Sequence, residues 1–269
     1  ATDDAKHLLR YRFEMGEVLR YRVRHATNVR TTIDGTTQQV ESQSESIKAW
    51  KVTDVLPSGD MEFVHMVEQV KMSNRMPGGQ VNEFDSQNDQ SPPPTFAKAA
   101  AAVGVPLSVL RIEPDGAVAR REQKHPQPPA SDDMPITLVL PAEPIAVGDK
   151  WDAVYEVPAQ RKSKASIKVR TRRLCRLTAV KSGVAVIEVD YQILTPIDSY
   201  VRSQLLERLT SGVVRFDIER GRIITQRHNV DDRVLGFAGQ ASSVHFVART
   251  QERLIDDDSV LISARGPAR

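Results

Sequence analysis

The stretch LLRYRFEMGEVLRYRVRH, residues 8–25, contains the tetrapeptide LRYR twice. From Leu19 onward, apolar side chains alternate with arginines, so Leu19, Tyr21 and Val23 point to one side of the backbone. A period of two is typical of a strand with one buried and one solvated face. The same alternation over residues 9–14 predicts a second, neighbouring strand segment. Because adjacent rows of arginine repel each other, we expect acidic side chains across the sheet.

Long alternating runs of this kind recur along the chain and are separated by turn residues. Asp34-Gly35 predicts a hairpin turn, and Gly221 allows another. Two short helices are expected, at 96–103 and 198–209, where apolar residues change to helical spacing. The predicted fold is therefore mainly β, a large curved antiparallel sheet or open half-barrel with two short helices.

Two stretches rich in proline and polar residues, 77–95 and 125–135, interrupt the strand pattern and are predicted to be loops. The second is the candidate boundary between an N-terminal β lobe, 1–135, and a C-terminal β lobe, 136–258. A polar tail, 259–269, follows. Each lobe repeats the order of strands, short helix and hairpin. Two related lobes and one continuous domain both remain open.

Composition excludes several classes of protein. With 40% hydrophobic and 27% charged residues, the chain of 269 residues can bury a sizeable core. The net charge of +2 argues against a dedicated nucleic-acid binder, which carries a large basic excess. No apolar run reaches the roughly 18 residues of a transmembrane helix. The single cysteine, Cys175, permits no disulfide within the chain and no cysteine-based metal site.

A search for catalytic motifs finds no nucleophile elbow, Walker loop, dinucleotide fingerprint or zinc-protease motif. The six histidines are scattered and none is paired at metal-ligand spacing. We therefore predict no enzymatic activity, no cofactor and no metal. The alternative is a hydrolase centred on His25 and His65, which would require a carboxylate within hydrogen-bonding reach of one of them.

One segment has an unusual charge pattern. Between Glu156 and Glu188 the chain holds nine basic residues and no acidic one. This pattern predicts a patch for an anion or an acidic partner. The alternative is an edge strand protected from aggregation by its charges. Arg173 breaks the alternation and predicts a bulge or a change of facing. The candidate residues are Lys168, Arg170, Arg172 and Arg173.

Three stretches carry a resemblance to a known group of proteins: FEMGEVLRYRV (13–23), LPAEPIAVGDKW (140–151) and GVVRFDIERGRIITQ (212–226). In this order they resemble an uncharacterised family of exported bacterial β-rich proteins. The resemblance implies a periplasmic or secreted location, with a signal peptide already removed, and no catalytic residues. In style it is similar to the lipoprotein-carrier half-barrel. Many such proteins carry a lipid anchor on an N-terminal cysteine, and Ala1 gives no support for one here.

These observations predict a non-enzymatic binding protein of the bacterial envelope that holds a lipid or another apolar or amphipathic ligand on a concave sheet face. The alternative is a structural subunit of a larger extracytoplasmic assembly, which would contact a protein partner through the loops at 77–95 and 125–135. A ligand-lining role is predicted for five apolar residues: Phe63, Val67, Phe96, Leu205 and Leu209.

Overall fold

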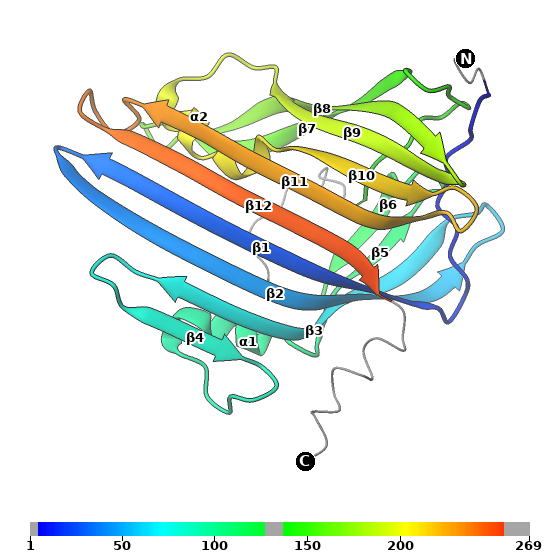
Figure 1. Ribbon diagram of the computed structural model, residues 1–269, viewed down its shortest axis with the longest axis horizontal. Helices are drawn as coiled ribbons and strands as arrows, with labels where there is room; N and C mark the ends of the chain where they lie inside the picture. The colour runs from blue at the N-terminus through cyan, green and yellow to red at the C-terminus, as the bar shows by residue number, and fades with distance from the viewer. Residues whose placement is uncertain (1–4, 127–136, 256–269) are drawn as a thin grey trace.

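The computed structural model of the chain describes residues 5–126 and 137–255 (Figure 1). The predicted polar tail and most of the predicted boundary at 125–135 lie outside these residues. Two antiparallel meanders make up the described part. The first comprises β1 (Val18–Ile33), β2 (Thr36–Val55), β3 (Met61–Arg75), β4 (Val81–Asp85), β5 (Pro106–Ile112) and β6 (Val118–Gln123). The second comprises β7 (Lys150–Gln160), β8 (Ser166–Lys181), β9 (Val184–Ile193), β10 (Ser211–Asp217), β11 (Arg222–Leu235) and β12 (Ser243–Ile255).

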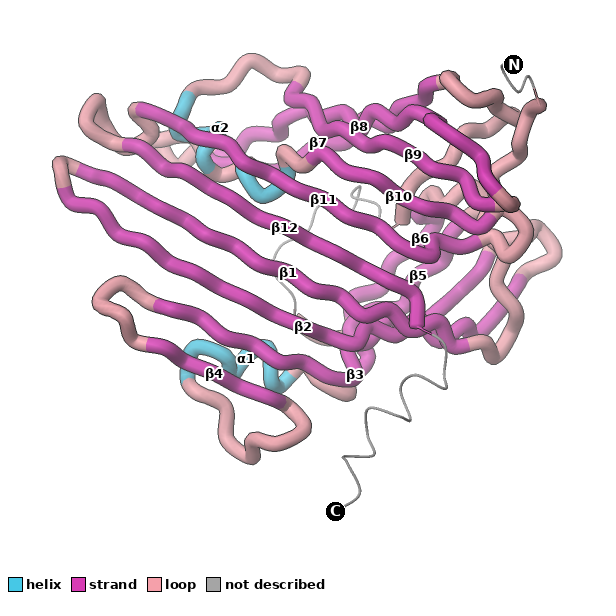
Figure 2. Tube along the Cα trace, in the orientation of Figure 1, coloured by secondary structure: helices cyan, strands magenta, loops and turns pink. Residues whose placement is uncertain are grey.

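Both meanders belong to one sheet. The strand order is β6-β5-β3-β2-β1-β12-β11-β10-β9-β8-β7, with β4 paired to the second half of β3. The first and last long strands, β1 and β12, therefore pair at the centre of the sheet (Figures 1 and 2). The sheet is not closed, because β6 and β7 form its two edges. The predicted large antiparallel sheet is confirmed.

The sheet curls so that strands of both meanders share one core. Leu19 and Trp50 of the first meander belong to the same apolar cluster as Ile187 and Phe216 of the second. In Figure 1 the sheet edges correspondingly lie behind β1 and β12. We call the face that carries these residues the inner face, and the opposite face the outer face. The inner face is the concave one.

The arginines of the second LRYR lie on the outer face of β1, as predicted. The expected acidic neighbours are also present: Arg20 pairs with Glu68 at 2.9 Å, and Arg24 pairs with Glu45 at 2.9 Å. Glu45 is additionally 3.4 Å from Arg22. Cross-strand pairs of opposite charge thus offset the repulsion within the arginine row.

The first LRYR is not a strand, contrary to the prediction. Residues 9–13, which we call the lead segment, are extended and lie inside the curled sheet. Leu9, Tyr11 and Phe13 are buried in the core shared by both meanders. Arg10 donates hydrogen bonds to the carbonyls of Pro141 and Ala142. Alternation alone does not separate an extended core-filling segment from a strand, because both place every second side chain on one side.

Both predicted helices form, each shorter than predicted. The first consists of a 3-10 turn, η1 (Pro94–Phe96), and α1 (Ala97–Ala101). The second consists of α2 (Ser199–Ser203), whose N-terminus is capped by Asp198, and the 3-10 turn η2 (Leu206–Arg208).

The prediction that 77–95 is entirely a loop is wrong, because this stretch contains β4. Phe84 anchors this strand: its side chain is buried and lies opposite Met72 of β3. Its two apolar residues, Val81 and Phe84, are three positions apart and do not alternate, so the sequence carries no strand signal here.

We predict that Gly221→Ala destabilises the fold much more than Gly35→Ala. Both glycines have positive φ, which costs other residues about 1–2 kcal/mol. At Gly221 an added Cβ would also lie 2.5 Å from the Arg12 nitrogen, whereas at Gly35 it would meet open space. That collision adds roughly 1–3 kcal/mol of overpacking. Urea denaturation of the two variants measures the difference. Equal losses would show that the lead segment is not packed against this turn.

Candidate functional site

The five predicted lining residues lie in different places. Phe63 is fully buried and stacks on Trp50 with ring centroids 4.7 Å apart, in the core shared by both meanders. Leu205 belongs to a separate cluster beneath α2. Phe96 is buried, whereas Val67 and Leu209 are half-buried. The structure therefore does not bring these residues together around one space.

Between these apolar clusters, the inner face carries polar groups, centred on an ion pair. Lys48 Nζ lies 2.6 Å from Glu252 Oε1, and the two side chains are only 17% and 10% exposed. The ammonium group also lies 4.9 Å from the ring centroid of Trp50 and 5.1 Å from that of Tyr21. The rings and the carboxylate together stabilise a cation that would otherwise be costly to bury.

Beside this pair, three neighbouring strands present a row of polar side chains. Trp50 of β2 lies opposite His65 of β3, which lies opposite Ser108 of β5. Trp50 Nε1, His65 Nδ1 and Ser108 Oγ are all buried without a hydrogen-bond partner among the described residues. An unsatisfied buried polar group costs about 1–3 kcal/mol, so three in one row call for an explanation.

A second group lies on the inner face of the other meander. The Arg173 guanidinium lies 5.7 Å from the ring centroid of Tyr155 and 5.4 Å from that of Tyr191. Both tyrosine hydroxyls are buried without a partner among the described residues. Arg173 donates a long hydrogen bond, 3.4 Å, to the Thr137 carbonyl and forms no ion pair within the described ranges. It is thus a half-buried cation held by aromatic rings.

The inner face also holds His25 of β1 and His228 of β11, which lie on either side of β12. His25 Nδ1 is 2.8 Å from Thr250 Oγ1, and Thr250 lies opposite His228 in the register. His228 Nε2 is 3.2 Å from Gln226 Oε1, while its Nδ1 has no partner in the part of the chain that is described. Gly212 leaves room for the ring, because a Cβ there would lie 2.7 Å from Nδ1.

Burial keeps His65 and His228 neutral. Burial, together with the positive charges of Lys48 and Arg121, lowers the pKa of His65 to about 4. Burial and the charge of Arg173 lower the pKa of His228 to about 4, although Glu252 acts in the opposite direction. Both rings can therefore donate and accept hydrogen bonds without carrying charge at neutral pH.

The hydrolase alternative finds no support in this arrangement. His65 lies opposite Trp50 of β2, whereas His25 lies opposite Ser44 of the same strand. These two positions on β2 are six residues apart, so the two rings do not meet. Within the described residues, neither ring has a hydrogen bond to a carboxylate. The same residues contain no cluster of three or more potential metal ligands. Burial raises the pKa of the Cys175 thiol to about 12, which leaves it unreactive.

The predicted basic patch divides between the two faces of β8. Lys168, Arg170 and Arg172 lie on the outer face, where Lys168 pairs with Glu156 at 2.9 Å. Arg173 lies on the inner face with regular alternation, so the predicted bulge is not at this residue. The register shift falls further along, between Leu177 and Ala179. β8 is also not an edge strand, because it pairs with both β7 and β9.

Sequence reasoning missed Lys48 and Glu252. Each occupies an inward-facing position of an alternating run, and a charged residue at such a position is a signal of a buried ion pair. The partners lie on strands at opposite ends of the chain, so only the pairing of β1 with both β2 and β12 brings them together.

We predict that Lys48→Met alone lowers the free energy of unfolding by about 3–5 kcal/mol, because it leaves a buried carboxylate unpaired. The double variant K48M/E252M, which replaces both charges with apolar groups, should recover most of that loss. Urea denaturation of the single and double variants measures the coupling. A double variant as unstable as the sum of the singles would contradict a coupled buried pair.

A second prediction concerns acid stability. Because the native pKa of His65 and His228 is about 4 and the unfolded value is 6.5, the unfolded state binds more protons between these values. Stability should therefore fall as the pH drops from about 6.5 towards 4. In urea titrations, the free energy of unfolding of H65Q/H228Q should fall less steeply with decreasing pH than that of the unmodified protein. H245Q, on the outer face, should show the same slope as the unmodified protein. Identical slopes in all three proteins would contradict neutral buried rings.

No helix in the described ranges is both long and apolar enough to cross a bilayer. No protein-family model and no curated protein sequence matches the chain. Among solved structures, the chain is similar to lipovitellin, in a structure titled for its lipid–protein interactions, with a TM-score of 0.49 and 10% identity over 91% of this chain. The chain spans 26% of that protein's length. It is also similar to DynF from the dynemicin biosynthesis pathway of Micromonospora chersina, with a TM-score of 0.25, 7% identity, and coverage of 96% of this chain and 93% of that one.

Proposed function

We propose that the protein is a non-enzymatic binding protein that holds an amphipathic ligand on the inner face of its sheet. One observation supports the proposal above all: buried polar atoms without partners gather on this face, among apolar clusters. Within the described residues these atoms are Trp50 Nε1, His65 Nδ1, Ser108 Oγ, Tyr155 OH, Tyr191 OH and His228 Nδ1. A ligand with several polar groups would satisfy donors and acceptors that the protein itself leaves open.

The charge on this face favours a ligand with an anionic head group. Lys48 is neutralised by Glu252, whereas Arg173 has no acidic partner among the described residues. A carboxylate or phosphate beside Arg173 would supply the missing counter-charge with a charge-assisted hydrogen bond. The apolar part of the ligand would then lie along half-buried inner-face residues such as Val23 and Met72.

Location outside the cytoplasm is part of the same proposal and rests on the family resemblance of the three quoted stretches. The alternative function, a structural subunit that docks through the loops at 77–95 and 125–135, also stays a prediction. Residues 127–135 of the second loop lie outside the described part of the chain.

The proposal predicts that protein purified natively from its own host carries a bound amphiphile. Organic extraction followed by mass spectrometry should find one lipid-like molecule near a stoichiometric ratio. Extraction of protein unfolded before purification is the control, since it should yield none. Natively purified protein that is free of any amphiphile would contradict a carrier function.

Arg172 and Arg173 offer a matched pair of variants, because they are adjacent in sequence and lie on opposite faces of β8. Arg173→Gln should weaken the binding of oleate, used as an anionic probe, by about tenfold or more, as expected for one charge-assisted contact. Arg172→Gln should leave it unchanged. Isothermal titration calorimetry measures both. Equal weakening in the two variants would mean that oleate binds through general surface charge.

A further inference from the structure

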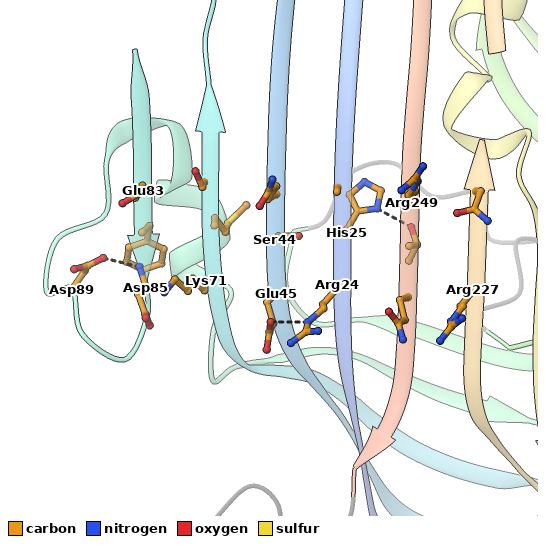
Figure 3. Close-up of a pocket in the computed structure, with 18 residues that line it drawn as sticks. Arg24, His25, Ser44, Glu45, Lys71, Glu83, Asp85, Asp89, Arg227 and Arg249 are labelled. Carbon is orange, nitrogen blue, oxygen red and sulfur yellow. Dashed lines mark hydrogen bonds and ion pairs between the residues drawn. The ribbon is translucent and has the colours of Figure 1, made fainter. Parts of the chain in front are cut away.

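The outer face carries a groove that the proposed inner site does not involve. Its volume is about 930 Å³, and it crosses β4, β3, β2, β1, β12 and β11 (Figure 3). Two successive outer-face rows line it. In strand order the first row is Asp85, Lys71, Glu45, Arg24, Gln251 and Arg227, and the second is Glu83, Ser73, Gln43, Ala26, Arg249 and Asn229.

The strand register places the groove on the outer face. Between the two rows lies a middle row, of which β4, β3, β2, β1 and β12 each contribute one residue that also lines the groove, such as His25, Ser44 and Thr250. Because side chains alternate, the side chains of this middle row point to the inner face and only their backbone can contact the groove. The groove is thus a trough across the strands, with Ala26 and Ser73 as short side chains in its floor.

The charges of the groove are separated along its length. Three arginines, Arg24, Arg249 and Arg227, come from β1, β12 and β11, and these three strands contribute no acidic lining residue. The carboxylates lie towards the other end, on β2, on β4 and just after it: Glu45, Glu83, Asp85 and Asp89. Figure 3 shows this separation, with Arg227 and Arg249 at one side and Asp85 and Asp89 at the other.

The three arginines lie close together in the two rows. Arg24 and Arg227 both lie opposite Gln251, on either side of β12, and Arg249 is two residues away on the same face of that strand. Diagonal neighbours of this kind have Cα atoms about 7–8 Å apart, well within reach of arginine side chains. The amide groups of Gln251 and Asn229 are in the same two rows. Three neighbouring strands therefore supply donors at this end of the groove.

Two of these arginines have no counter-ion among the residues that the structure describes. Arg24 uses its Nε for Glu45, at 2.9 Å, which leaves its two terminal nitrogens. Arg227 and Arg249 are exposed and form no ion pair in the described part of the chain. Their like charges repel at this separation, and an anion bound between them would remove that repulsion. Guanidinium groups match the geometry of phosphate oxygens with paired N–H donors.

We propose that the arginine end of this groove binds a compact phosphate group, held by Arg24, Arg227 and Arg249. The acidic end restricts the size of the ligand, because Glu83, Asp85 and Asp89 would repel a polyanion that lay along the groove. The proposal therefore favours a small phosphorylated molecule or a phospholipid head group over a nucleic acid. It is independent of the inner-face ligand.

The test uses pyrophosphate as the probe in isothermal titration calorimetry. The variant R227Q/R249Q should bind pyrophosphate at least about tenfold more weakly than the unmodified protein, since two charge-assisted contacts are lost. The control is R233Q/R253Q, which removes the same charge from the outer face of the same two strands but outside the groove. It should keep the affinity within about twofold. Equal thermal unfolding of both variants would show that the fold is intact.

Three outcomes distinguish the possibilities. Binding of pyrophosphate together with vesicles of phosphatidic acid in phosphatidylcholine would support the site and identify a lipid head group as its source. Binding of pyrophosphate without vesicle binding would support the site for a free phosphorylated molecule. No pyrophosphate binding, equal loss in both double variants, or tighter binding of a single-stranded oligonucleotide would overturn the proposal. Arg173→Gln should leave pyrophosphate binding unchanged, so failure of the inner site is detected separately.

Discussion

The extended lead segment, buried within the curled sheet, determines how the inner face is used. Tyr11 shows the constraint most clearly. Its hydroxyl donates to the Leu138 carbonyl at 3.1 Å, and its ring meets Phe216 edge-on at a centroid distance of 5.4 Å. Next to it, Gly116 must lack a side chain, because a Cβ would lie 2.5 Å from the ring. One aromatic residue thus joins the lead segment, the turn before β6, the connection between the meanders, and β10.

The lead segment covers only part of the inner face. Where the lead segment packs, the inner side chains are apolar and buried. Other inner-face positions of the sheet carry Lys48, Glu252 and His228. Desolvation makes these residues costly, and the costs are only partly offset by the Lys48–Glu252 pair and the aromatic rings around it. Buried charged and polar groups with incomplete pairing are often found at functional sites.

The two faces differ in how they handle charge. On the inner face, His65 and His228 stay neutral and one arginine, Arg173, is held by aromatic rings. On the outer face, several charges form ion pairs across strands, such as Arg20 with Glu68 and Lys168 with Glu156. This division follows from the period of two along each strand, which places Arg172 and Arg173 on opposite faces of β8.

Alternation and turn residues were sufficient to predict the sheet, the hairpins and both helices, because these depend on local sequence. They did not predict that residues 9–13 fill the core, since an extended segment and a strand have the same period. Nor did they predict the site. Trp50, His65 and Ser108 come from three strands, and the arginines of the groove come from both ends of the chain. Their meeting depends on pairings between segments far apart in sequence, for which a single sequence contains no local signal.

The central pairing of β1 with β12 has a consequence for biogenesis. Each meander consists of neighbouring hairpins and can pair its strands as they emerge during synthesis. The seam between the meanders cannot form until β12 is complete, so β1 must wait with one edge open while the strands between them are translated. Long-range pairings of this kind form slowly, and unpaired strand edges are prone to aggregate. The positive charges of the arginines on the outer side of β1 would oppose aggregation through that open edge until β12 pairs with it.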